Sequence, residues 1–176
     1  MPNKPKLRAE RTDQSLIHAA KHVEYEIAML VQTSAILGSE YASPPSTLTT
    51  VDRNMALESF LIHFRNLRSF LCPSLQFLGD DDVIASDFLG ERMPRDIGDS
   101  VHLSADKQRI NRMLSHISYR REEYITSGDS GWQITHLTLV ALGEFERFLT
   151  QLPGEKVSWF PSHETIREQS ARFGGR

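Results

Sequence analysis

The sequence has little of what several common protein classes require. Its 176 residues include one cysteine, Cys72, so the chain cannot form an internal disulfide. Cys72 lies in the apolar stretch "SFLCPS", a setting that favours ordinary packing over an activated thiol. The sequence has no glycine-rich phosphate loop, dinucleotide-binding fingerprint, nucleophile elbow or paired-cysteine zinc pattern. These absences exclude several common enzyme classes.

An excess of basic charge is also lacking. With 20 Lys and Arg against 23 Asp and Glu, the formal net charge is -3, which excludes the strongly basic balance of a protein that coats nucleic acid. RNA binding would therefore need a local basic patch. The basic N-terminus, "MPNKPKLRAER", runs into no continuous apolar stretch. We therefore expect no signal peptide, no transmembrane helix and a cytoplasmic protein without membrane contact.

What the sequence does contain is the composition of one folded domain. A hydrophobic fraction of 39% with 24% charged residues is typical of globular proteins. A length of 176 residues allows one complete core and is too short for two ordinary domains with a linker. We therefore expect a single domain over residues 1–176, with a core at about 12–152 and a tail at 153–176.

Apolar residues recur at helical spacing in four segments, which predicts amphipathic helices. The first helix spans about 12–37 and is expected to end at Gly38. The second begins with a capping box from Thr49 to Asp52 and is stopped by Pro73. The apolar stripe of the first helix consists of Leu16, Ala20, Val23, Ile27, Leu30 and Leu37, and that of the second consists of Leu57, Phe60, Leu61, Phe64, Leu67 and Leu71.

Two further helices follow a long connection at 73–103. The third is expected to begin with Ser104 as its N-cap, and the fourth to begin with a capping box at Ser130 and to end at Pro153-Gly154. Their apolar faces consist of Ile110, Met113, Leu114, Ile117 and Ile125 in the third helix and of Ile134, Leu137, Val140, Ala141, Phe145, Phe148, Leu149 and Leu152 in the fourth. No segment alternates like a strand. The predicted fold class is all-α, a four-helix up-and-down bundle with a long connection between the second and third helices and a C-terminal extension.

One face of the third helix carries a row of cationic and aromatic side chains. Arg109 and His116 lie seven positions apart, and so on one face, together with Arg112 and with Tyr119 or Arg120. Histidine changes protonation near neutral pH, and a guanidinium binds phosphate through two nitrogens, so the row suits phosphodiester chemistry. The alternative is a solvated charged face that forms ion pairs with acidic residues of the same helix.

An Arg and a His separated in this way on a late helix of a bundle of this size resemble the motif of the HEPN superfamily, many of whose members are metal-independent ribonucleases of toxin and phage-defence systems. In that motif a polar residue usually follows the Arg, whereas an isoleucine follows Arg109. The resemblance implies a homodimer whose composite site cleaves RNA, with Arg109 and His116 as catalytic residues and with Arg112, Tyr119 and Arg120 as substrate-binding residues. It implies His116 as general base on a 2′-hydroxyl and Arg109 as the stabiliser of charge on the phosphorus oxygens, with a 2′,3′-cyclic phosphate product and no metal or cofactor.

Other histidines offer weaker candidates for chemistry. His63 flanks the apolar stripe of the second helix, and it is either a further catalytic or metal-binding residue or a boundary residue hydrogen-bonded to a neighbouring helix. His63, His116 and His136 would have to converge from three helices without the Glu-x-x-His pairs of helical di-iron sites. His18 and His22 lack a third ligand. We therefore expect no metal.

The long connection and the tail carry the remaining candidates. An acidic group in the connection lacks EF-hand spacing and is expected to form a solvated turn or a helix cap, while an apolar group packs over one end of the bundle. The acidic group consists of Asp80, Asp81, Asp82 and Asp87, and the apolar group of Val83, Ile84, Phe88 and Leu89. Trp159 and Phe160 form either a lid on the core or an anchor for a partner. The alternative to a ribonuclease is a non-catalytic helical module that binds a protein through the 73–103 connection or the Trp159 tail.

Overall fold

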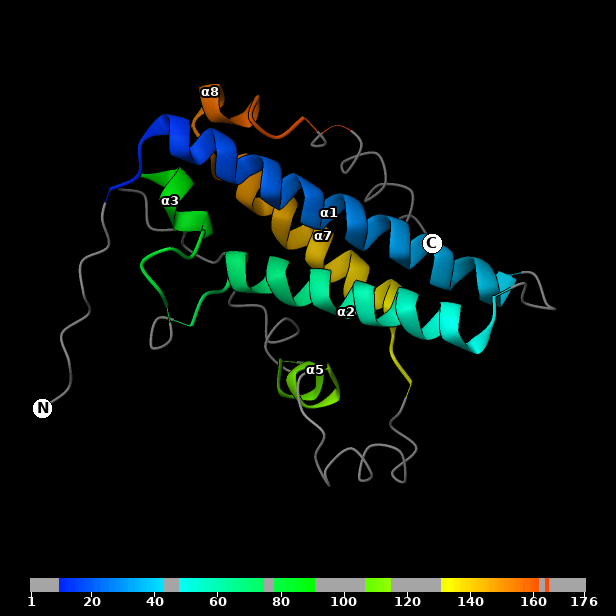
Figure 1. Ribbon diagram of the computed structural model, residues 1–176. Helices are drawn as coiled ribbons and strands as arrows, with labels where there is room; N and C mark the ends of the chain where they lie inside the picture. Colours follow the sequence, from blue (N-terminus) through cyan, green and yellow to red (C-terminus); the bar gives the residue numbers. More distant parts are fainter. Residues whose placement is uncertain are drawn as a thin grey trace, which may run out of the picture.

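The described part of the chain is helical. The computed structural model describes residues 10–42, 48–74, 78–90, 107–114, 131–161 and 164. Three long helices, α1 (Asp13–Ala42), α2 (Thr50–Leu71) and α7 (Ile134–Gln151), are accompanied by the short helices α3 (Ala85–Leu89), α5 (Lys107–Leu114) and α8 (Gly154–Val157) (Figure 1). Within these ranges no strand occurs, so the prediction of an all-α protein is confirmed for them.

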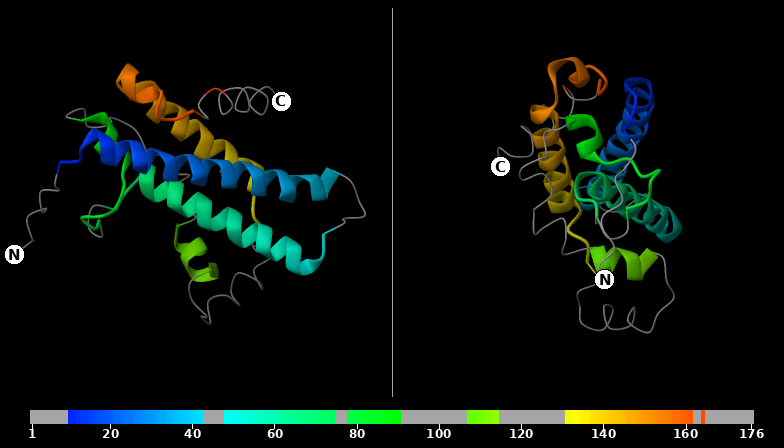
Figure 2. Two further views of the ribbon diagram at one scale, coloured as in Figure 1. Left: turned by 45° about the horizontal axis from the view of Figure 1, so that its top comes forward. Right: turned by 90° about the vertical axis from the view of Figure 1, so that its left-hand side faces the viewer.

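The three long helices pack side by side around a common core. Helices α2 and α7 both run in the direction opposite to α1, and each contacts the other two (Figures 1 and 2). All six residues of the apolar stripe predicted for α1 are buried, as are five of the six predicted for α2, where Leu57 is half-buried. Burying one continuous stripe per helix is what holds three helices together in water.

The ends of the helices agree with the sequence at some points and differ at others. The predicted capping box is present, because the Thr49 hydroxyl accepts from the backbone N–H of Asp52 at 3.1 Å while the Asp52 carboxylate accepts from the N–H of Thr49 at 3.0 Å. Helix α1 does not end at Gly38 but continues to Ala42, since a glycine lowers helix propensity without ending a helix whose other side is packed. Helix α7 begins at Ile134 with Gln133 as its N-cap, and no side-chain capping bond forms there.

Helix α3 and the segment after α7 close one end of the core with aromatic rings. The Phe88 and Phe160 rings are fully buried and lie 5.4 Å apart, and both pack on Phe148, at 5.9 and 5.4 Å. Phe160 therefore belongs to a lid, and the core extends past residue 152. Ile84 and Leu89 are buried beside Phe88 as expected, whereas Val83 is 38% exposed.

Helix α5 is the described part of the predicted third helix. It lies against α2 and is seen almost end-on in Figure 1, and its Ile110 is buried. Ser104, Ile117 and Ile125, which were expected to belong to the same helix, lie outside the described residues, as does Ser130. Among the helices that the structure describes, none has both the length and the apolar character needed to cross a bilayer.

Candidate functional site

Arg109 lies on α5 and is held by the segment that precedes α7. Its guanidinium carbon lies 3.9 Å from the centroid of a Trp132 ring, and one of its terminal nitrogens donates to the Gly131 carbonyl at 2.8 Å. Both contacts cross from α5 to residues more than twenty positions later in the chain. Stacking on an indole and a carbonyl bond together fix the orientation of the guanidinium plane.

The other residues of the predicted row are described only in part. The backbone of Arg112 lies in α5, one turn after Arg109, but its side chain is outside the described residues. His116, Tyr119 and Arg120 lie outside them entirely. The structure therefore places one member of the proposed catalytic pair.

His63 joins α2 to α1 through a partly buried polar contact. Its Nδ1 lies 2.6 Å from a carboxylate oxygen of Glu26, and Asn66, one turn further along α2, donates to the same oxygen at 3.1 Å. The ring of Tyr25 packs edge-on against the imidazole with centroids 5.6 Å apart. His63 is therefore a boundary residue bonded to the neighbouring helix, which is one of the two roles that its sequence position suggested. Glu26 carried no signal in the sequence, because a partner on another helix is defined only by the fold.

The remaining polar candidates have local roles. His18 lies in hydrogen-bond range of Gln14, with 3.1 Å between their nitrogens. The Asp82 carboxylate accepts from the Gly79 N–H at 2.6 Å, and the Asp87 carboxylate accepts from the Ile84 N–H at 3.3 Å. These bonds form a turn and the N-terminus of α3, as expected for the acidic group. Among the described residues, no group of three or more His, Cys, Asp or Glu side chains could hold a metal ion.

Two apolar residues flagged in the sequence are packed against the core. Cys72 is half-buried and caps the C-terminus of α2, where its N–H donates to the Arg68 carbonyl at 2.7 Å. Trp159 is half-buried beside Phe160, and the Lys156 ammonium lies 5.4 Å from its ring centroid. The tail residues up to Pro161 are thus part of the folded body.

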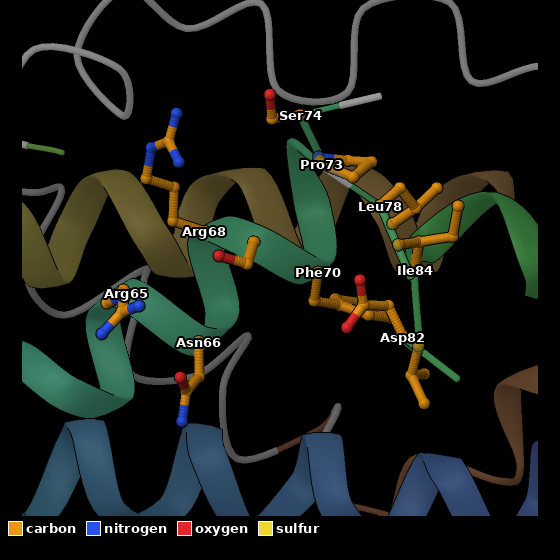
Figure 3. A pocket seen from close by; sticks show the side chains of 11 residues that line it. Arg65, Asn66, Arg68, Phe70, Pro73, Ser74, Leu78, Asp82 and Ile84 are labelled. Atoms are coloured by element: carbon orange, nitrogen blue, oxygen red, sulfur yellow. The ribbon is translucent and has the colours of Figure 1, made fainter. Parts of the chain in front are cut away.

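A cavity that the sequence did not predict lies between the second half of α2 and residues 78–84 (Figure 3). Its volume is about 390 Å³, and the side chains of Arg65, Arg68 and Ser69 contribute to its wall. A smaller cavity of about 130 Å³ lies between α1 and α2 and shares Asn66, Phe70 and Val83 with the first. Burial lowers the pKa of the Arg68 guanidinium below its usual value.

Comparison with known proteins gives no relative for this chain. No family model matches the sequence, no curated protein matches it, and no solved structure matches its fold.

Proposed function

We propose that the protein is a HEPN-like four-helix bundle that works as a metal-independent endoribonuclease of a toxin or defence type, with one composite active site in a homodimer. The observation that supports this proposal is the setting of Arg109, whose guanidinium is held on the Trp132 ring and on the Gly131 carbonyl. A cation that is oriented before the substrate arrives stabilises developing charge without reorganising during the reaction.

The proposed reaction uses a histidine and arginines without a metal. The His116 imidazole removes the proton of an RNA 2′-hydroxyl, whose oxygen attacks the adjacent phosphorus. The bond to the 5′-oxygen of the next nucleotide breaks, and that oxygen takes up a proton. Arg109 stabilises the negative charge on the phosphorus oxygens, while Arg112 and the residues Tyr119 and Arg120 contact the RNA backbone. The products are a 2′,3′-cyclic phosphate and a 5′-hydroxyl.

The test is RNA cleavage by the purified full chain in EDTA. Total RNA and structured RNA are incubated with the parent protein, with His116→Ala and with His18→Ala, and the product ends are analysed for cyclic phosphate. His18 is the matched control, because it is an exposed histidine of α1 on a different element from Arg109. We expect cleavage by the parent and by His18→Ala and none by His116→Ala.

Two results would contradict the proposal. One is intact RNA with the parent protein when circular dichroism shows it to be helical. The other is cleavage that His116→Ala leaves unchanged, which would assign the activity to another site or to a contaminant. The oligomeric state, measured by light scattering in the same buffer, tests the dimer separately.

A specific observation also favours the second function, a non-catalytic module that binds a protein. Large apolar side chains are exposed on α1 and α2. Those of α1 are eleven residues apart and those of α2 are four and seven residues apart, so the exposed side chains of each helix lie on one line. This outer α1–α2 face consists of Tyr25, Ile36, Val51, Met55 and Ile62. The Tyr25 ring also contacts His63 of α2, the residue after Ile62. Exposed apolar side chains that gather in this way mark surfaces for protein contact.

Met55→Glu distinguishes these functions. Met55 is 62% exposed, so the variant should fold and lose only what the outer α1–α2 face binds. A parent dimer that becomes monomeric and inactive in Met55→Glu would assign the face to the ribonuclease. A parent that neither cleaves RNA nor dimerises leaves the binding module as the better function.

A further inference from the structure

The cavity beside α2 has a cationic and polar end. Arg65, Arg68 and Ser69 lie on the last two turns of α2, and Ser74 lies just past the end of that helix. In Figure 3 the two arginines lie at one side of the cavity, with Ser74 above it. Arg65 is exposed, whereas Arg68 is buried to 8% exposure. Two guanidiniums and two hydroxyls supply the hydrogen-bond donors that a phosphate group requires.

The opposite end of the cavity is mostly apolar. Leu78, Ile84 and Pro73 lie there, together with Phe70, whose ring also packs into the aromatic core (Figure 3). A volume of about 390 Å³ falls in the usual range for sites that bind small molecules. A cavity with donors at one end and apolar walls at the other fits a ligand with the same division.

Acidic and amide groups around the cavity are engaged in the fold. The Asp82 carboxylate accepts from the Gly79 N–H at 2.6 Å, which builds the turn that forms one wall. The Asn66 amide turns away toward α1, where it donates to Glu26 at 3.1 Å (Figure 3). These contacts shape the cavity, and among its lining residues the two arginines outnumber the single carboxylate, Asp82.

From this arrangement we infer that the cavity binds the phosphate group of a nucleotide, with the phosphate between Arg65 and Arg68 and the base against the apolar wall. The phosphate can belong to a free nucleoside monophosphate or to a nucleotide of an RNA strand. The burial of Arg68 supports the placement of the phosphate, because the attraction between a phosphate and a guanidinium grows as water is excluded around the cation. The inference uses neither Arg109 nor His116, so it is independent of the proposed ribonuclease.

A simpler role for the two arginines is the stabilisation of the C-terminus of α2. Cations near the last turn of a helix interact favourably with its carbonyl end, and Arg68 lies in that turn. This role alone predicts no ligand and no preference for phosphate. Titration of the folded protein therefore separates the two interpretations.

The experiment is isothermal titration calorimetry of the full chain with four probes: inorganic phosphate, adenosine 5′-monophosphate, adenosine, and a single-stranded oligoribonucleotide without terminal phosphates. The parent is compared with Arg65→Gln, and Arg53→Gln is the matched control, since it removes the same charge from an exposed position of α2 outside the cavity. Arg68→Lys keeps the charge but loses two-nitrogen contact with the phosphate. Circular dichroism verifies that each variant is folded.

We expect the monophosphate to bind more tightly than adenosine and Arg65→Gln to weaken it by about tenfold, the effect of losing one charge-assisted hydrogen bond. Arg53→Gln should bind like the parent, and Arg68→Lys should bind more weakly. Tighter binding of the oligoribonucleotide than of the monophosphate, again dependent on Arg65, would identify an RNA strand as the source of the phosphate. The inference is overturned if adenosine binds as well as its monophosphate, if no probe binds, or if Arg53→Gln and Arg65→Gln weaken binding equally.

Discussion

The contact between His63 and Glu26 makes a quantitative prediction about how α1 and α2 are held together. The two groups lie 2.6 Å apart, and their side chains are 10% and 22% exposed, so the contact is shielded from water on most sides. Hydrogen bonds that involve a charged group contribute about 1.5–3 kcal/mol, and a partly exposed pair belongs near the lower end of that range. We therefore expect Glu26→Ala and His63→Ala each to lower the free energy of unfolding by about 2 kcal/mol or more, with His63→Ala the larger because it also removes the ring that packs on Tyr25.

A double-mutant cycle measures the pair itself. The parent, the two single variants and the double variant are unfolded in urea at one pH, and their midpoints are compared at constant slope. Because each single variant already breaks the contact, the double variant should be more stable than the sum of the two losses predicts, by about 1–2 kcal/mol. Asn66→Ala, which removes the second donor to Glu26 from an exposed position, should cost less. Strictly additive losses would refute the assignment of His63 to a structural pair.

Four further predictions concern the lid, the capping box and Arg109. Phe160→Ala should lower the free energy of unfolding by about 3–5 kcal/mol, because its ring is fully buried among other aromatic rings. Calorimetry should show a melting temperature that is lower by about 2–4 °C for each kcal/mol lost. An unchanged melting temperature would contradict the assignment of Phe160 to the lid. Thr49→Ala should cost about 1 kcal/mol through loss of the N-cap. The Thr49 hydroxyl and N–H lower the pKa of the Asp52 carboxyl below its usual value, so this carboxylate stabilises α2 above its unfolded-state pKa and ceases to do so as the pH falls through its folded pKa. Asp52→Asn should remove that part of the acid dependence in a pH series of urea midpoints. Trp132→Leu should slow RNA cleavage by the proposed ribonuclease by a larger factor than its loss in the free energy of unfolding accounts for, because it removes the ring that orients Arg109.

The sequence predicted the features that depend on neighbouring residues. The stripe from Leu16 to Leu37 needed only the helical period, and the capping box needed only Thr49 and a carboxylate three residues later. The same local reasoning misplaced the end of α1, because Gly38 is exposed on a helix whose far side is packed, and the packing outweighs the propensity of a single residue. It also assigned a capping box to the start of α7, where the observed N-cap, Gln133, forms no side-chain cap.

The contacts between separate elements are of the opposite kind. Glu26 is separated from His63 by 37 positions and Arg109 from Gly131 by 22, and no period in the sequence relates either pair. The cavity likewise needs the end of α2 and residues 78–84 to meet at a distance set by the aromatic lid. Arg109 was noticed because it shares a helix face with a histidine, whereas Arg65 lay in a stretch interpreted through His63. Arg109, which shares a helix face with a histidine, is engaged with a tryptophan, and Arg65, which no histidine follows within six residues, lines a cavity. A residue pattern on one helix therefore selects candidates for chemistry, and the packing of a second element determines the surroundings of each candidate.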